Sequence, residues 1–142
     1  MFFYNISSAH CEIPCGIYGD NARFKLLREH IHTMEKSIKM IKTLSNKKDP
    51  ESKNQLVRWV RNKEKHAKEF QQIIWQYFLT QRIKPVNSED KKLYSKYLNK
   101  LEVLHKLSFY SMKVKQSLKE DNINKLKKLL DRFEKMYMNH NH

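Results

Sequence analysis

The sequence predicts an all-α protein, an up-down-up-down four-helix bundle that follows a short N-terminal segment of different composition. After Gly19 the chain contains no glycine, and only Pro50 and Pro85 interrupt it. This part is rich in Lys, Leu, Glu, Gln and Met, which favour helices. Its apolar residues recur every three or four positions, as on the buried face of a helix. Four such stretches joined by short polar connections favour an antiparallel bundle.

The first two helices are predicted from residue 20 to 44 and from Pro50 onward, with Asp20 and Asp49 as their N-caps. The buried face of the first should consist of Phe24, Leu27, Ile31, Met34, Ile38 and Ile41. That of the second should consist of Leu56, Val60, Ala67, Phe70, Ile74 and Tyr77. Lys63 occupies a position on this second face where an apolar residue is expected.

The third and fourth helices are predicted after two further breaks in the chain. The first break is the segment 85–88, where Ser88 is expected to cap the third helix. Its buried face should consist of Tyr97, Leu101 and Leu104, widened by Leu93, Leu98 and Leu107. The second break is Asp121-Asn122, and the fourth helix should bury Ile123, Leu126, Leu130, Phe133 and Tyr137.

Length and charge narrow the class of protein further. A chain of 142 residues suits one domain. Its 29 Lys and Arg against 15 Asp and Glu give a net charge of +14, and 39% of its residues are hydrophobic, enough to fold. We expect no membrane span, because no run of about 20 apolar residues occurs. Residues 1–9 lack the basic start and the length of a secretory signal, which predicts a cytoplasmic protein.

The segment His10-Cys11-Glu12-Ile13-Pro14-Cys15-Gly16-Ile17-Tyr18-Gly19 holds both cysteines and both glycines of the chain. By itself, a Cys-x3-Cys pair is compatible with a redox dithiol, half of a zinc site, or two small hydrophobic residues. A structural zinc site needs four ligands, and only His10, Cys11 and Cys15 lie close together. A disulfide could close so tight a loop, but no thioredoxin-like pattern surrounds it.

The order H-C-x-x-P-C-G-x-Y, followed by predicted helices, resembles the signature of the nickel superoxide dismutases. All seven fixed residues of that signature are present, and Tyr77-Phe78 resembles an aromatic pair late in the second helix. The resemblance implies a leader at 1–9 removed by a maturation protease between Ala9 and His10, a nickel hook at 10–19, and a four-helix bundle at 20–142. It also implies a homohexamer.

The resemblance further implies that His10, Cys11 and Cys15 bind a nickel ion that cycles between Ni(II) and Ni(III) to disproportionate superoxide. The donor chemistry agrees, since two thiolates with an amine and a deprotonated amide form a planar set suited to Ni(II). That set requires His10 to be the first residue, so the uncleaved chain should be inactive.

Other hook residues receive supporting roles from the resemblance. Tyr18 is the predicted catalytic residue, because its phenol stands over the open face of the metal and restricts entry to small anions. Glu12, Pro14 and Gly16 are predicted to shape the hook rather than to bind the metal, and Gly16 permits a close approach of the backbone.

One departure from the family pattern concerns the residues that steady the imidazole of His10. The family places an acid early in the first helix, where this chain has Lys25 and Leu26. Glu29, one turn later, is the nearest substitute, and Lys63 is the predicted basic partner, with Arg58 and Arg61 as alternatives. The histidines on the predicted helices are interpreted as surface or hydrogen-bonded groups.

Two alternatives come from other functional classes. The pI of 9.8 and the lysine-rich helices would suit a basic nucleic-acid-binding protein, but no recognised binding motif is present. A cysteine redox sensor would account for Cys11 and Cys15, yet it leaves His10, Pro14 and Tyr18 unexplained. For a superoxide dismutase, the same positive charge would attract the anionic substrate.

Overall fold

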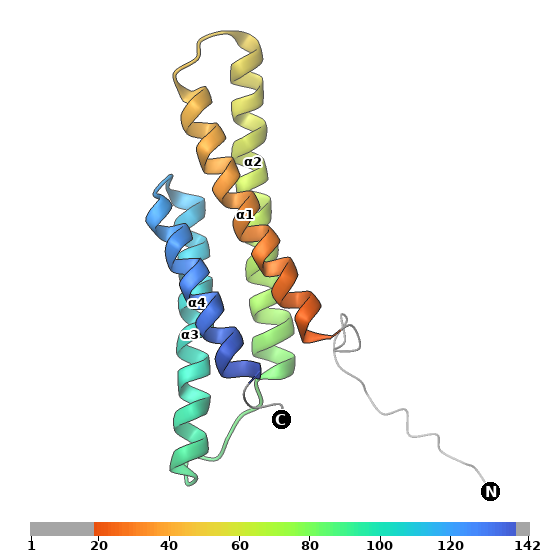
Figure 1. The fold of residues 1–142 in the computed structure, drawn as a ribbon, viewed down its shortest axis with the longest axis vertical. Coiled ribbons are helices and arrows are strands. Elements are labelled where there is room, and N and C mark those ends of the chain that lie inside the picture. The colour runs from red at the N-terminus through yellow and green to blue at the C-terminus, as the bar shows by residue number, and fades with distance from the viewer. Residues whose placement is uncertain (1–18, 139–142) are drawn as a thin grey trace, which may run out of the picture.

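The computed structural model describes residues 19–138, which form four helices and, within that range, no strand (Figure 1). The elements are α1 (Asp20–Ser45), α2 (Pro50–Gln72), α2's π-helical continuation η2 (Ile73–Arg82), α3 (Lys91–Gln116) and α4 (Glu120–Met138). The predicted all-α bundle is therefore confirmed. None of these helices is both long enough and apolar enough to cross a lipid bilayer.

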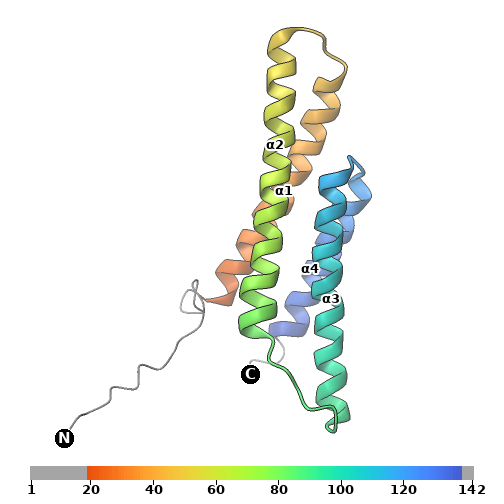
Figure 2. The same ribbon diagram turned by 180° about the vertical axis from the view of Figure 1, so that it is seen from behind.

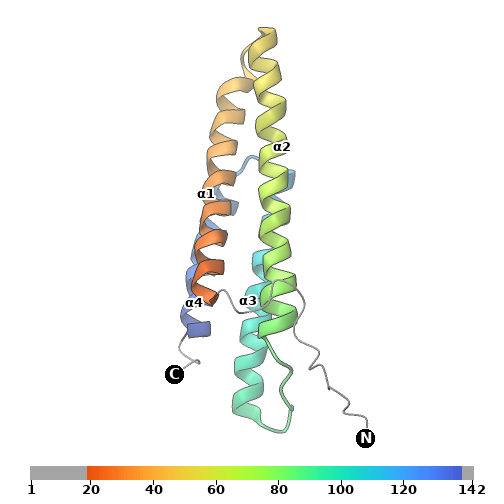
Figure 3. The same cartoon turned by 90° about the vertical axis from the view of Figure 1, so that its right-hand side faces the viewer.

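The bundle is built from two helical hairpins. α1 packs along α2, and α3 packs along α4, while α2–α3 and α1–α4 contacts join the two pairs. Figures 1 and 2 show that the far end of the α1–α2 hairpin projects beyond the connection between α3 and α4. The view in Figure 3 shows the first turns of α3 extending past the opposite end of the bundle. The two hairpins are thus offset along their long axis.

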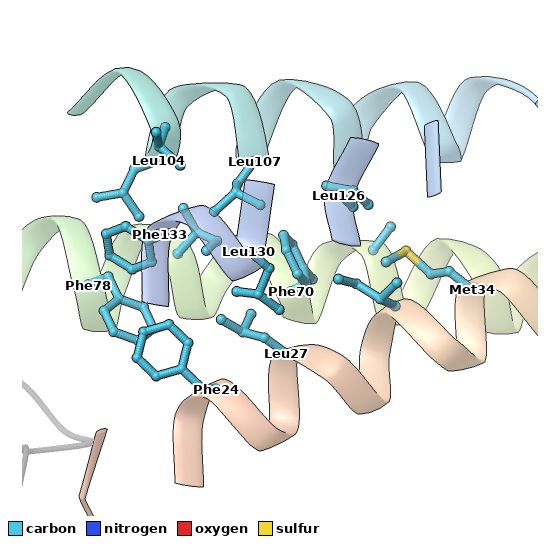
Figure 4. Close-up of a cluster of buried hydrophobic side chains, with 14 of the residues drawn as sticks. Phe24, Leu27, Met34, Phe70, Phe78, Leu104, Leu107, Leu126, Leu130 and Phe133 are labelled. Atoms are coloured by element: carbon cyan, nitrogen blue, oxygen red, sulfur yellow. The ribbon is translucent and has the colours of Figure 1, made fainter. Parts of the chain in front are cut away.

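The core lies where all four helices overlap, and large apolar side chains fill it (Figure 4). The rings of Phe24 and Phe133 lie 4.9 and 5.0 Å from that of Phe78, measured between centroids. Burial of such a side chain contributes about 1.5–3 kcal/mol to folding. All residues predicted to form the buried faces of the first and fourth helices are buried. Those two faces are confirmed.

The offset of the hairpins overturns part of the prediction for the second and third helices. Val60 is 39% exposed and Leu56 is only half-buried, because the first turns of α2 lie beyond the end of α3. Leu93 and Leu98 are 51% and 45% exposed, since the first turns of α3 extend past η2 and α4. Apolar spacing identified these helix faces correctly but not how far each one is covered.

The helix caps also differ in part from expectation. Asp49 does cap α2, accepting a hydrogen bond from the backbone N–H of Ser52 at 2.8 Å. Asp90, and not Ser88, caps α3 by accepting from the N–H of Leu93 at 3.0 Å. Gly19, and not Asp20, stands at the N-cap of α1 with φ of 75°, a left-handed conformation that favours glycine. Asp20 is the first residue of α1, and its carboxylate accepts hydrogen bonds from side chains of η2 and α4 instead of capping the helix.

Candidate functional site

Except for its last residue, Gly19, the predicted hook lies outside the residues that the structure describes. This holds for the predicted metal ligands His10, Cys11 and Cys15, for Tyr18, and for Glu12, Pro14 and Gly16. The description begins at Gly19, directly after Tyr18. What the structure describes is therefore the end of the bundle from which the hook continues.

That end is organised around the carboxylate of Asp20. Its Oδ1 accepts hydrogen bonds from the Tyr77 hydroxyl at 2.5 Å and from Arg82 Nε at 3.0 Å. Its Oδ2 accepts from Arg82 Nη2 at 2.9 Å and from the Tyr137 hydroxyl at 2.7 Å. These four residues, the anchor cluster, tie the first residue of α1 to η2 and to the last turn of α4.

The π-helical geometry of η2 brings two of these donors together. Tyr77 and Arg82 are five residues apart, and in a π-helix the i→i+5 hydrogen bonds place such residues about one turn apart. The Ile83 N–H donates to the Phe78 carbonyl at 2.9 Å, and the Thr80 hydroxyl donates to the Trp75 carbonyl at 2.7 Å. In an α-helix, residues five apart diverge around the axis, so the widened turns allow both side chains to reach Asp20.

The pKa values within the anchor cluster show that it is charged at neutral pH. Burial alone would raise the pKa of Asp20, but hydrogen bonds from Arg82, Tyr77 and Tyr137 outweigh it and lower that pKa. Burial and the bond to Asp20 raise the pKa of Tyr77 to about 12 and also raise that of Tyr137. The bond to Asp20 raises the pKa of Arg82. The cluster is therefore an ion pair with two neutral phenols.

A groove of about 520 Å³ runs between α1 and α2, next to the anchor cluster. Tyr77 lines the groove at the anchor cluster, and the guanidinium of Arg23 lies 5.0 Å from the centroid of the Tyr77 ring. His30 and Glu69 line it further along the two helices. The groove connects the start of α1 to a second group of polar side chains.

This second group, the histidine cluster, consists of His30 on α1 with His66 and Glu69 on α2. The Nδ1 atoms of the two imidazoles are 2.8 Å apart, and Glu69 Oε2 lies 3.8 and 3.9 Å from them. Among residues 19–138, it is the one group of three His, Cys, Asp or Glu side chains with atoms close enough to share a metal ion. Sequence spacing could not reveal it, because His30 and His66 are 36 residues apart.

The two residues predicted to steady the imidazole of His10 are not brought together. Glu29 is exposed on α1. Lys63 is buried, and its Nζ donates to the carbonyls of Lys115 at 2.9 Å and Ser117 at 3.2 Å. Burial lowers the pKa of Lys63. The last carbonyls of α3 thus provide the partner that a lysine on a buried face requires.

Lys63 also lies far from the start of α1. It precedes Tyr77 by 14 residues of helix, which corresponds to about 21 Å along the axis. The anchor cluster supplies a different acid and base, Asp20 and Arg82, which sequence reasoning missed as a pair. No sequence signal pointed to Arg82, because its position depends on the π-helical turns of η2.

Comparison with models of known protein families gives a match over nearly the whole chain. The family model for nickel-containing superoxide dismutase matches residues 5–141. Neither a curated protein nor a solved structure matches the chain. The matched range covers the cysteine-containing segment and all four helices. The chain therefore belongs to the family of nickel-containing superoxide dismutases, enzymes that use a nickel ion to disproportionate superoxide.

Proposed function

We propose that the hook, residues 10–19, holds the nickel ion of this enzyme through His10, Cys11 and Cys15. The donors would be the amine and imidazole of His10, the amide nitrogen and thiolate of Cys11, and the thiolate of Cys15. The observation that carries this assignment is the chemistry of the available donors. Thiolates stabilise oxidised nickel better than imidazole or carboxylate does, and Cys11 and Cys15 are the only cysteines in the sequence.

The other candidate donors suit nickel redox chemistry poorly. Within residues 19–138, the histidine cluster offers two imidazoles and one carboxylate, with no sulfur. Such a set favours a divalent ion that keeps its oxidation state. The two groups therefore differ in kind, and only the hook combines soft sulfur donors with strong nitrogen donors.

The proposed site requires maturation of the N-terminus. While residues 1–9 remain attached, the nitrogen of His10 is an ordinary amide and cannot act as an amine ligand. A protease that cleaves between Ala9 and His10 would free it, and the small side chains of Ser8 and Ala9 suit such a cleavage. The domain division is accordingly a leader at 1–9, the hook at 10–19 and the helical bundle from 20 to the C-terminus.

The reaction converts two superoxide anions and two protons into dioxygen and hydrogen peroxide, and the nickel ion supplies the one-electron chemistry. Tyr18 would hold the small anion or an ordered water through its hydroxyl and limit access to larger molecules. Glu12, Pro14 and Gly16 would maintain the shape of the hook. The net charge of +14 raises the concentration of anions at the protein surface.

The proposal also includes the oligomeric state of the enzyme and its location in the cell. A homohexamer in the cytoplasm would shield the reactive thiolates through neighbouring subunits. In support, Val57, Trp75 and Leu79 on α2 and η2 and Phe109 on α3 are large apolar side chains that are between 38% and 52% exposed. Exposed apolar groups of this kind are common where subunits meet. Light scattering at physiological salt tests the hexamer, and an active monomer would exclude it.

The decisive experiment measures the mature N-terminus by mass spectrometry, together with nickel content and activity. Chains that begin at His10 should bind about one nickel through the hook and be active. Chains that retain Met1, and the variants Cys11→Ser and Cys15→Ser, should lose activity and the thiolate-to-nickel absorption. Full activity in a Met1-containing chain would exclude the proposed site.

A second measurement tests the role of Tyr18. Tyr18→Phe keeps the ring and removes only the hydroxyl, so nickel binding should persist while turnover falls moderately and inhibition by small anions changes. Loss of nickel binding would instead make Tyr18 a structural part of the hook.

The predicted support of His10 by Glu29 and Lys63 stays a prediction. Glu29→Gln should alter the pH dependence of activity if Glu29 acts on that imidazole, and an unchanged profile would remove it from the site. No observation favours the nucleic-acid-binding or redox-sensor alternatives.

A further inference from the structure

We propose that His30, His66 and Glu69 form a second metal site, distinct from the hook, that binds Zn²⁺ or a closely similar divalent ion. The site lies on the bundle itself, between α1 and α2. It goes beyond the nickel chemistry of the family, because it contains no thiolate and does not depend on the N-terminus.

Helix geometry explains why these three side chains converge. His66 and Glu69 are three residues apart on α2, so they are neighbours on one face of the helix. His30 reaches the same point from α1, which packs along α2. One turn of α2 and one residue of α1 thus supply two imidazoles and a carboxylate, a combination that occurs in zinc sites.

The three donor atoms lie close enough together for one zinc ion to reach all of them. His30 Nδ1, His66 Nδ1 and Glu69 Oε2 form a triangle with sides of 2.8, 3.8 and 3.9 Å. The point in their plane that is equidistant from the three atoms lies about 2.1 Å from each of them. This distance is typical of Zn–N and Zn–O bonds. A point therefore exists at bonding distance from all three donors.

The metal-free arrangement requires only small changes to accept an ion. The imidazoles now share a hydrogen bond, since their Nδ1 atoms are 2.8 Å apart. In a tetrahedral site, two donors at about 2.1 Å from zinc would be about 3.4 Å apart, so the 2.8 Å distance must widen by about 0.6 Å. Rotation of the rings toward Glu69 would achieve it, because within residues 19–138 no other hydrogen bond or ion pair fixes either imidazole.

The position of the Glu69 carboxylate is not explained by the hydrogen bond between the two histidines. It faces both imidazole nitrogens but lies beyond hydrogen-bond distance from each, at 3.8 and 3.9 Å. The ammonium group of Lys65 is also 3.8 Å away, from the other carboxylate oxygen of Glu69. The imidazoles therefore bond to each other but neither donates to the Glu69 carboxylate, and a cation between the three side chains would bind that carboxylate and both imidazoles.

Access and protonation also suit a metal ion. His30 is buried, but the side chains of His66 and Glu69 are 24% and 37% exposed, and the groove of about 520 Å³ reaches His30 and Glu69. A water molecule in the groove could fill the fourth position. Burial and the neighbouring His66 lower the pKa of His30, although Glu69 and Glu29 act against this. A neutral imidazole is the form that binds metal.

The test uses the full chain carrying Cys11→Ser and Cys15→Ser, so that the hook thiolates cannot bind the added ion. Zn²⁺ binding is measured by competition with a chelator, and Co²⁺ serves as a spectroscopic probe of the ligands. In this background, His66→Gln and Glu69→Gln each remove one ligand. His32→Gln is the matched control, because His32 is exposed on α1 two residues from His30. Circular dichroism confirms that each variant folds.

We expect the parent chain to bind one Zn²⁺ whose binding depends on the histidine cluster. The Co²⁺ spectrum should indicate nitrogen and oxygen ligands only. His66→Gln and Glu69→Gln should each weaken Zn²⁺ binding by more than about 100-fold, since loss of even an outer hydrogen-bond partner weakens metal sites about 10- to 100-fold. His32→Gln should change it by less than about twofold. Equal binding by His66→Gln and His32→Gln would overturn the proposal, as would the absence of Zn²⁺ binding in the parent chain.

Because every variant lacks the hook thiolates and the readout is metal binding rather than activity, this result is independent of the nickel site. The tail histidines His140 and His142 are present in all variants. Any ion they bind therefore contributes equally to each measurement, and only a difference between variants counts for the cluster.

Discussion

The anchor cluster and the histidine cluster both connect α1 to the continuous helix formed by α2 and η2. The polar groups of the two clusters are satisfied in different ways. In the anchor cluster, both oxygens of Asp20 accept two hydrogen bonds each, and its charge is balanced by Arg82. In the histidine cluster, one hydrogen bond joins the imidazoles and the carboxylate of Glu69 remains out of reach.

The difference indicates what each cluster does. A partly buried charge stabilises a fold when it is paired and fully hydrogen-bonded, which makes the anchor cluster a structural connection at the start of α1. In the histidine cluster the Glu69 carboxylate receives no hydrogen bond from either imidazole, and a cation held between the three side chains would stabilise it. Stability measurements can separate these two cases, because only the second cluster should depend on added metal.

The largest effect is expected for Asp20→Asn. This change leaves Arg82 without its counter-charge, and breaking such a pair costs about 3–5 kcal/mol when fully buried. Since the Arg82 side chain is 33% exposed, we expect a loss of about 2–3 kcal/mol in the free energy of unfolding. Urea denaturation of the full chain measures it.

The matched control for that change is Asp131→Asn. Asp131 pairs with Arg28 on the surface, where the side chains are 55% and 46% exposed, so the loss should stay below about 1 kcal/mol. Equal losses in the two variants would show that the anchor cluster is an ordinary surface ion pair.

A smaller effect is expected for removal of a single phenol hydroxyl. Tyr77→Phe and Tyr137→Phe each delete one hydrogen bond to the Asp20 carboxylate and keep the ring in the core. Hydrogen bonds to charged groups contribute about 1.5–3 kcal/mol, and the remaining donors to Asp20 favour the lower value. Thermal unfolding would reveal the loss, and an unchanged melting temperature for both variants would contradict the hydrogen-bonding scheme.

High pH should weaken the same contact. The pKa of Tyr77 rises from 10.0 to about 12 in the folded chain. A raised folded pKa means that the stabilisation is fully present below pH 10 and is lost as the pH rises from about 10 to 12. Stability measured across this range should therefore fall less steeply in Tyr77→Phe than in the parent chain, and identical slopes would refute the shift.

The smallest effect on metal-free stability is expected for His66→Gln. Its side chain is partly exposed and makes one hydrogen bond, so we expect a change within about 1 kcal/mol. Saturating Zn²⁺ should then raise the melting temperature of the Cys11→Ser, Cys15→Ser parent but not that of the same chain with His66→Gln. Equal stabilisation of both would place the bound zinc elsewhere.

Apolar period predicts burial better in α1 and α4 than in α2 and α3, for a physical reason. Residues such as Leu27 and Leu130 follow a helical period and lie where all four helices overlap, so period alone predicted their burial. Val60 and Leu93 follow similar patterns but are exposed, because the first turns of α2 lie beyond the end of α3 and the first turns of α3 extend past η2 and α4. Periodicity defines a face of one helix and contains no information about the axial offset between hairpins.

The sequence by itself predicted the metal chemistry that we propose for residues 10–19, because the signature is local and depends on residue types at short spacing. It also determined the all-α class, since helix propensity and apolar period act within single segments. The tertiary structure alone decided the partners of Asp20, the carbonyls bound by Lys63 and the meeting of His30 with His66. These contacts join residues 36 to 117 positions apart, and packing of whole helices, rather than local spacing, brings such residues together.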